Sequence, residues 1–323
     1  MTDASNPVSM RALALESGTV VELLPSEVAE YRGTGFVWLH VDRAGRSPSP
    51  DLPNYVPRLA ANALFATETR PRCDEIDNAA LINLRGTGQE TATDSDSLVS
   101  IRVWVEANRV TSVSRRPLAA LEKVETAMRA GRLLDGGDFV STLAQTISTE
   151  LDPKIADLGD EMDDCEAAIE DGNVYSLRRR IAILRSQAIA LRRFIAPDRN
   201  ALATMAQLEF AWISKEDRLH LRDAADRFAR MAEELEAVRE RAALLHEQLT
   251  DLRTEQIDRR SLAIAIVAFI FLPLTFVTGL LGMNVEGIPF ANRDWAFWGV
   301  VGFCLLIGAA VVGWFAVRQW LSD

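Results

Sequence analysis

Cysteine and histidine are scarce in this chain, which has three of each in 323 residues. Cys73, Cys165 and Cys304 are far apart and odd in number, so they form neither a disulfide framework nor a zinc-knuckle spacing. No histidine is paired with cysteines or carboxylates at ligand spacing, and we interpret all three as surface or packing residues. Because no nucleophile–base set, phosphate loop or metal-hydrolase spacing is found either, the sequence predicts no enzyme.

Positive charge is also in deficit. The chain has 35 lysines and arginines against 46 acidic residues, a formal net charge of −11. This balance argues against nucleic acid as a partner, because phosphate binding needs clustered basic residues, and it fits a protein that handles cations. The N-terminus has no basic segment followed by an apolar one, so we expect no signal peptide and a cytoplasmic N-terminal part.

Two stretches near the C-terminus have no charged residue at all. They cover residues 261–281 and 295–317. Each is long enough to cross a hydrocarbon core of about 30 Å as a helix. The alternative is a pair of buried core helices, but uncharged runs of this length are rare in soluble proteins. The sequence therefore predicts two transmembrane helices and contact with a lipid bilayer.

The flanking residues predict the orientation of these helices. Arg259 and Arg260 precede the first run and Arg318 follows the second, whereas the connecting segment 282–294 has only Arg293. Positive residues concentrate on the cytoplasmic side of membrane proteins. We therefore expect an inner-membrane protein with both termini in the cytoplasm, a periplasmic loop at 282–294 and a cytoplasmic tail at 318–323.

The remaining 260 or so residues divide into two parts. Residues 1–138 contain short β-branched runs separated by Pro- and Gly-containing turns, which predicts an α+β domain with a mostly antiparallel sheet. Residues 139–260 are helical in pattern, with one helix expected to end at Pro197. A longer helix begins near "SKEDRLH" and, without Pro or Gly from Asp217 to Leu272, continues into the first membrane run.

This long helix has a heptad-like apolar seam, which we expect to need partner helices. The seam consists of Phe228, Met231, Leu235, Val238, Ala242, Leu245, Leu249 and Leu252.

The stretch "FLPLTFVTGLLGMN", followed by a second span, resembles the CorA superfamily of metal-ion transporters, whose mark is Gly-Met-Asn after the first span. "ETRPRCDEIDNAALINLRG", "LRRFIAPDRNAL" and "GIPF" resemble its zinc-transporter branch, ZntB. The resemblance implies a funnel-shaped homopentamer with an α+β cytoplasmic domain, a long stalk helix and two C-terminal transmembrane helices. It also implies transport of divalent cations, with no cofactor other than the transported Zn²⁺ or Mg²⁺.

One face of the first span is our candidate pore lining. Its residues are small, aliphatic or hydroxylic, so such a pore would pass hydrated ions; ordinary helix packing through small residues is the alternative. They are Ser261, Ile264, Ala268, Leu272, Thr275 and Gly279.

The Gly-Met-Asn segment is the candidate selectivity site, comprising Gly282, Met283 and Asn284 with Glu286 nearby. Five Asn284 amides could hydrogen-bond the water shell of a hydrated dication, although Asn also suits a helix cap. Glu286 departs from the zinc branch, and Phe290 stands where the magnesium branch has a second Glu. The choice between zinc and a magnesium/cobalt channel therefore stays open.

Acidic residues in the long helix are candidate metal ligands. Glu247, Asp251 and Asp258 lie one or two turns apart, in line with the pore face; a solvated helix face is the alternative. Neither span contains an ionisable residue, so no proton relay crosses the bilayer, and proton coupling stays open. A membrane-anchored coiled-coil sensor without transport is the remaining alternative.

Overall fold

The computed structural model describes residues 9–31, 33–42, 52–66, 70–88, 98–169, 174–283 and 293–320, without the side chains of 174–175 and 315–320. It comprises two compact units, Met1–His246 and Glu247–Asp323, which are described separately below.

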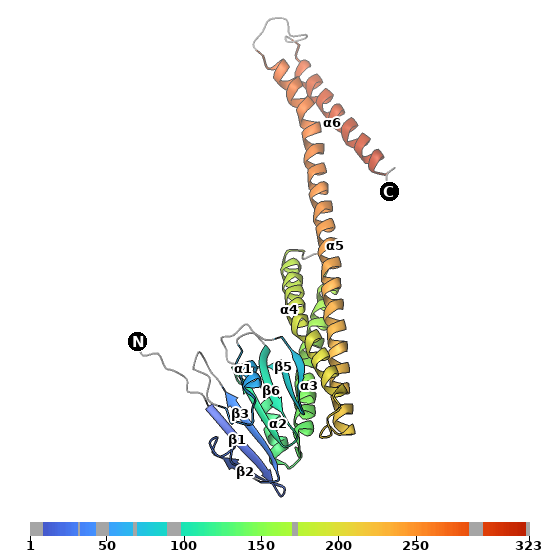
Figure 1. Cartoon of the computed structure of the whole chain (residues 1–323). Helices are drawn as coiled ribbons and strands as arrows, with labels where there is room; N and C mark the ends of the chain where they lie inside the picture. Colours follow the sequence, from blue (N-terminus) through green and yellow to red (C-terminus); the bar gives the residue numbers. More distant parts are fainter. Residues whose placement is uncertain are drawn as a thin grey trace, which may run out of the picture. The chain divides into compact units, whose positions relative to one another are not determined.

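The first unit contains a seven-stranded sheet (Figure 1). Its strands are β1 (Ser9–Glu16), β2 (Thr19–Leu23), β3 (Phe36–Asp42), β4 (Arg72–Ile76), β5 (Ala79–Thr87), β6 (Leu98–Val105) and β7 (Arg109–Ser114), in the order β2-β1-β3-β7-β6-β5-β4. Every neighbouring pair is antiparallel except β3 and β7, which run parallel. The predicted α+β domain with a mostly antiparallel sheet is confirmed.

Both faces of this sheet are covered, as β3 illustrates. Successive side chains of a strand point to opposite faces. Val37, Leu39 and Val41 join a core cluster with residues of α1 (Arg58–Leu64). Phe36 and Trp38 face the other way, with ring centroids 6.3 and 5.2 Å from that of Phe139 in α3 (Gly136–Ala167). The strand is therefore buried along nearly its whole length, as its continuous apolar run suggests.

The helical layer follows the sheet in the chain. It consists of α2 (Ala120–Arg129), α3, α4 (Val174–Gln207) and the beginning of α5 (Lys215–Leu281). The expected helix end at Pro197 is wrong, because α4 continues for ten residues beyond this proline. Proline removes one backbone hydrogen bond from a helix. Burial of Ala201, Leu202 and Met205 in the last turns offsets that loss.

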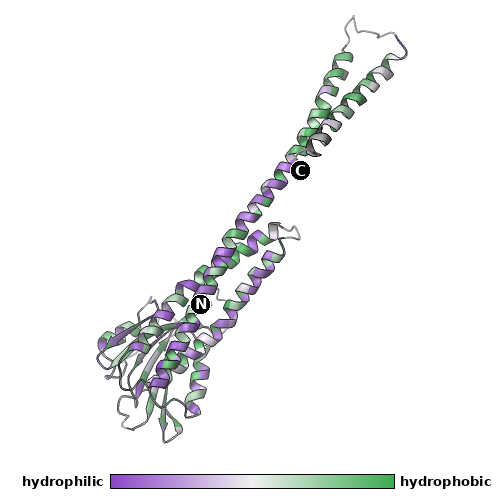
Figure 2. Ribbon diagram, turned by 90° about the vertical axis from the view of Figure 1, so that its right-hand side faces the viewer, coloured by the Kyte–Doolittle hydropathy of each residue, from purple (hydrophilic) through white to green (hydrophobic). Residues whose placement is uncertain are grey.

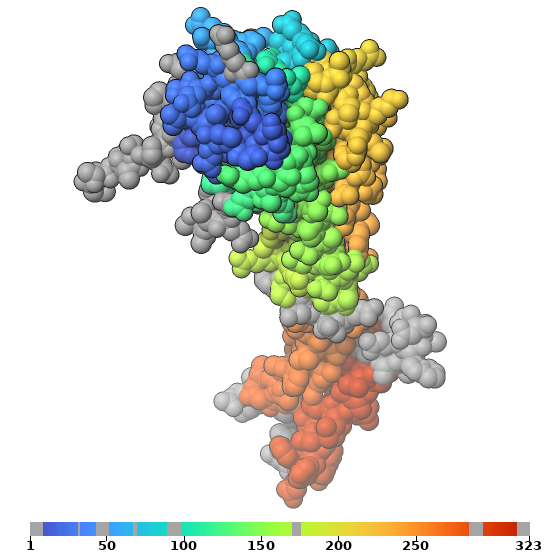
Figure 3. All heavy atoms as spheres, turned by 90° about the horizontal axis from the view of Figure 1, so that it is seen from below, coloured from blue at the N-terminus to red at the C-terminus, as the bar shows by residue number. Residues whose placement is uncertain are grey.

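The apolar seam of α5 is buried from Phe228 to Leu245 within a single chain. Ion pairs from α5 to its neighbours show what covers it: Arg241 pairs with Asp163 and Glu166 of α3, and Arg192 of α4 lies 2.9 Å from Glu236. In Figure 3 the green surface of α3 lies beside the yellow surface of the first part of α5. This part of the seam therefore packs against partner helices, as expected, and these helices belong to the same protomer.

The second unit contains the rest of α5 and α6 (Ala296–Trp320). Both helices are long and apolar enough to cross a membrane, and Figure 2 shows the apolar colouring along them.

Candidate ion pathway and acidic clusters

The predicted pore face is exposed along its whole length in the single chain. All six of its residues are exposed, among them Leu272 at 75% and Ile264 at 71%. The half-buried residues of the same segment are Ile266, Ile270, Pro273, Leu274, Val277 and Leu281. At about 100° per residue, these two sets lie on opposite sides of the helix. The predicted face is thus the side of α5 opposite its half-buried stripe.

Thr275 is the main polar group on this face. Its hydroxyl donates to the carbonyl oxygen of Phe271 at 2.7 Å, one turn earlier. A hydroxyl oxygen that donates its proton in this way still has two lone pairs. It can therefore accept a hydrogen bond from the water shell of a cation. Thr278 also donates within the helix, to Leu274 at 3.0 Å, but it projects about 90° from the centre of the pore face.

The start of the Gly-Met-Asn segment continues the helix. The backbone N–H of Gly282 donates to the carbonyl of Thr278 at 2.9 Å, and the side chain of Met283 is half exposed. Asn284 and Glu286 lie outside the described residues, as does Phe290. The selectivity role of this segment stays a prediction.

The acidic residues predicted along α5 do not form a cluster within the described chain. Glu247, Asp251 and Asp258 are exposed, as is the neighbouring Thr254, and among the described residues they belong to no group of three ligand atoms close enough to share one ion. Such carboxylates could attract hydrated cations, but they are not arranged to bind a bare one.

Three other carboxylates do come together, at the start of α3 and α5. Oxygen atoms of Asp135, Asp138 and Asp217 all lie within 4.8 Å of one another. Asp135 caps α3 by accepting the N–H of Asp138 at 2.9 Å. Asp217 forms a capping box with Ser214: the backbone N–H of each residue donates to the side chain of the other, at 2.9 and 3.0 Å.

Repulsion and burial both act on these carboxylates. Burial raises the pKa of Asp135, and the charges of Asp138 and Asp217 raise it further, while backbone N–H donors oppose the shift. The pKa of Asp138 is raised for the same reasons, burial first. Carboxylate oxygens are the ligands that Mg²⁺ and Ca²⁺ prefer. This group leaves no signal in the sequence, because its members come from segments about 80 residues apart.

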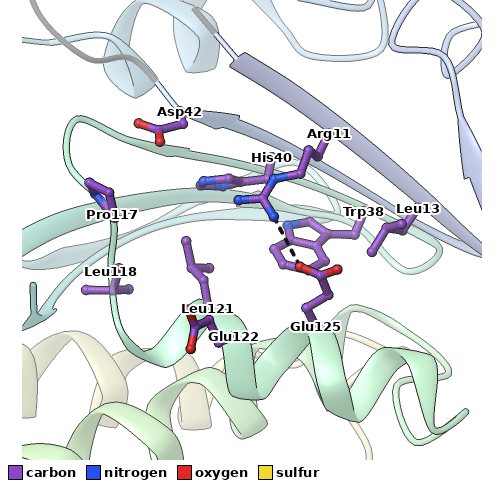
Figure 4. Close-up of a pocket in the computed structure, with 10 residues that line it drawn as sticks. All are labelled: Arg11, Leu13, Trp38, His40, Asp42, Pro117, Leu118, Leu121, Glu122 and Glu125. Carbon is purple, nitrogen blue, oxygen red and sulfur yellow. Dashed lines mark hydrogen bonds and ion pairs between the residues drawn. The ribbon is translucent and has the colours of Figure 1, made fainter. Parts of the chain in front are cut away.

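A further polar group surrounds His40, in a cavity of about 190 Å³ between the sheet and α2 (Figure 4). The indole N–H of Trp38 donates to Ser112 Oγ at 2.8 Å, so the Ser112 hydroxyl proton is available to His40 Nδ1, also 2.8 Å away. Burial, with a contribution from Arg11, lowers the pKa of His40 to about 3. His40 is therefore the neutral packing residue that we predicted, held by hydrogen bonds.

The geometry defines a class: an α+β domain followed by one long helix that continues as the first of two helices of membrane-spanning length, with an uncharged helix face left open. Residues 33–318 match the family model described as "CorA-like Mg2+ transporter protein". The chain belongs to this family of membrane metal-ion transporters, which is not a family of enzymes.

Relatives with known names are similar to this chain over nearly its whole length. The chain is 30% identical to "Zinc transport protein ZntB" of Pectobacterium carotovorum, over 88% of each chain. It is 32% identical to "Divalent cation transporter CmaX" of Pseudomonas aeruginosa, over 94% of this chain and 90% of the relative.

Solved structures show the same fold. That of full-length CmaX matches with a TM-score of 0.73 at 29% identity, over 99% of both chains. The CorA magnesium transporter of Methanocaldococcus jannaschii matches with a TM-score of 0.75 at 17% identity, over 96% of this chain and 98% of the other. The predicted family and the architecture of one protomer are confirmed, and the chain is a CorA-family divalent-cation transporter.

Proposed function

We propose that this transporter carries zinc across the inner membrane through a pentameric pore lined by the exposed face of α5. The observation that supports it most is the uncharged face of α5, which includes Thr275 and lies opposite the half-buried stripe. In a ring of copies such faces can surround a common axis, since closed rings arise from repeated contacts of one kind. A pore of this composition suits ions that keep their water shell.

Zinc is the proposed cargo because the ZntB relatives carry that name at about 30% identity over most of the chain. Magnesium is the second candidate, favoured by the description of the matching family and by Glu286, where the resemblance to the zinc branch breaks. This second candidate is a channel that would carry cobalt as well as magnesium. A sensor without transport would leave the open α5 face without a role.

The membrane potential is the proposed driving force. No proton-coupling group is placed within the spans, because neither span has an ionisable residue. With both termini in the cytoplasm, a negative-inside potential drives a dication inward with about 4.6 kcal/mol per 100 mV, twice the single-charge value. If protons are coupled to transport, the coupling groups lie in the loop or the stalk, where Glu286, Asp258 and Glu247 are the candidates.

The deciding experiment is uptake of ⁶⁵Zn²⁺ and of Mg²⁺ into proteoliposomes, with and without a pH gradient. The zinc proposal expects saturable zinc uptake exceeding that of magnesium. Faster magnesium uptake would assign the second candidate, and vesicles impermeable to both ions would leave the sensor reading. A response to the pH gradient at constant potential would establish proton coupling.

The proposed selectivity site has its own test. Asn284→Ala removes the amide that we expect to contact the ion's water shell, while Asn284→Gln keeps an amide. We expect the Ala variant to lose up to about tenfold in flux, or its preference among dications, without loss of assembly, since one hydrogen bond between neutral groups contributes about 0.5–1.5 kcal/mol. Unchanged flux in Asn284→Ala would remove the residue from the site.

A further inference from the structure

A cavity of about 340 Å³ lies between α3 and α4 and is closed by the sheet at one end. Most of its wall is apolar: Leu151, Ile155 and Leu158 come from α3, and Leu191 and Phe194 come from α4. This volume and lining are typical of sites that bind small organic molecules. The cavity is separate from the α5 face and from the acidic group at Asp217.

The polar part of the wall is positively charged. Arg85 of β5 and Lys154 of α3 line the cavity, and none of its ten lining residues is acidic. Lys154 forms no ion pair with the described residues. In a chain with a net charge of −11, two cations facing one apolar cavity create a local preference for anions.

Arg85 is held in place by two contacts. Its guanidinium carbon lies 3.8 Å from the centre of the Phe194 ring, and its backbone N–H donates to Asp198 Oδ1 at 3.1 Å. Asp198 is fully buried, and its Oδ2 has no hydrogen-bond partner in the described chain. Burial raises the pKa of Asp198 well above its usual value, against the opposing effect of Arg85.

We propose that this cavity binds a small organic anion with an apolar body, whose carboxylate or phosphate meets Arg85 and Lys154 while its body lies against the aliphatic and Phe194 side chains. A ligand placed in this way touches α3 and α4 together. Its volume of about 340 Å³ suits a small molecule. The inference does not depend on which metal is transported.

The test is calorimetric titration of the full-length protein in zwitterionic nanodiscs with 4-phenylbutyrate, phenyl phosphate, 4-phenylbutanol and inorganic phosphate. We expect at least one of the two phenyl anions to bind once per chain, and the neutral alcohol and inorganic phosphate to bind about tenfold more weakly or not at all. The two anions distinguish a carboxylate from a phosphate ligand. The proposal is overturned if the alcohol or inorganic phosphate binds as tightly as the better anion, or if neither anion binds.

Variants locate the site. Lys154→Gln changes an exposed side chain, so it leaves the fold intact, and it should weaken binding of the better anion about tenfold. Arg178→Gln is the matched control, because it removes a positive charge from an exposed position of α4 that does not line the cavity. Equal affinities in the two variants would show that the anion binds elsewhere and would overturn the assignment.

Discussion

At the scale of single residues, the buried polar side chains around His40 hydrogen-bond to one another. His40 is 5% exposed and lies between Ser112 and Ser114, 2.8 Å and 3.5 Å from their hydroxyl oxygens. Because the Trp38 N–H donates to Ser112, the Ser112 hydroxyl proton is free to donate to Nδ1; in that arrangement the neutral imidazole has its proton on Nε2. The network supplies hydrogen-bond partners for a neutral imidazole. Protonation of His40 would turn both ring nitrogens into donors and would remove the acceptor for the Ser112 hydroxyl proton.

This network predicts how stability depends on pH. His40 has a pKa of about 3 in the folded chain and an ordinary value of 6.5 when unfolded. Between these values the unfolded state binds more protons, so the free energy of unfolding falls as pH is lowered from 6.5 toward 3. At about 1.4 kcal/mol per pKa unit, the loss is on the order of a few kcal/mol.

Denaturant melts of the wild type and His40→Asn between pH 7 and 3 check this expectation. Arg11, Asp42 and Glu122 also face this cavity, and they contribute alike to both proteins. The variant should be less stable at pH 7 but lose less stability on acidification. Parallel curves for the two proteins would show that His40 does not titrate as described.

At the scale of elements, the local sequence pattern predicts where helices form and which face is apolar. Which helix packs against that face depends on tertiary contacts. The seam from Phe228 to Leu245 was predicted correctly as a buried stripe, but periodicity carries no information on whether the covering helix belongs to the same chain. Pro197 predicts a helix end because helix propensity depends only on the local sequence. The helix continues because the following turns are buried by tertiary contacts that the local sequence does not show. The group around Asp217 was invisible for the same reason.

The start of α3 is fixed by its close approach to the backbone of the sheet. A Cβ at Gly136 would lie 2.3 Å from the carbonyl oxygen of Glu106, which cannot move aside without breaking its strand connection. Gly136→Ala should therefore lower the free energy of unfolding by about 1–3 kcal/mol.

Gly159→Ala in the same helix is the matched control. There a Cβ would meet only the end of the flexible Glu234 side chain, at 3.2 Å. Replacing a glycine inside a helix by alanine stabilises it by up to about 1 kcal/mol. Chemical denaturation of both variants measures the difference, and equal destabilisation would contradict the contact at Glu106.

The membrane part of α5 offers an equally matched pair. Thr275→Val removes a hydroxyl from the proposed pore face, while Thr278→Val removes one that projects to the side; both hydroxyls donate to carbonyls of their own helix. We expect zinc flux to fall by roughly threefold to tenfold in Thr275→Val, because a polar contact to the hydrated ion is lost, and to stay near wild type in Thr278→Val. Equal flux in the two variants would place the ion path elsewhere.

At the scale of the whole molecule, the two units have different needs for partners. The first unit covers its sheet on both faces and its α5 seam by its own helices. The second unit leaves the predicted pore face of α5 exposed, opposite a stripe of half-buried residues. This face is mostly apolar but includes Ser261 and Thr275. Contact with lipid favours its apolar side chains, whereas a water-filled pore favours its hydroxyls. A ring of copies reconciles these demands, with lipid outside and the hydroxyls inside.

Ala268→Trp tests that arrangement, because it places one indole per protomer in the middle of the proposed lining. If five copies share the axis, the rings occlude it, and flux should fall by at least about tenfold. Native mass spectrometry in mild detergent should still give five times the protomer mass of 35.7 kDa. Ala309→Trp, on an exposed position of α6, adds the same side chain away from α5 and should change neither mass nor flux. A monomeric wild type, or an Ala268→Trp variant that conducts normally, would contradict the proposal that these faces surround a pore.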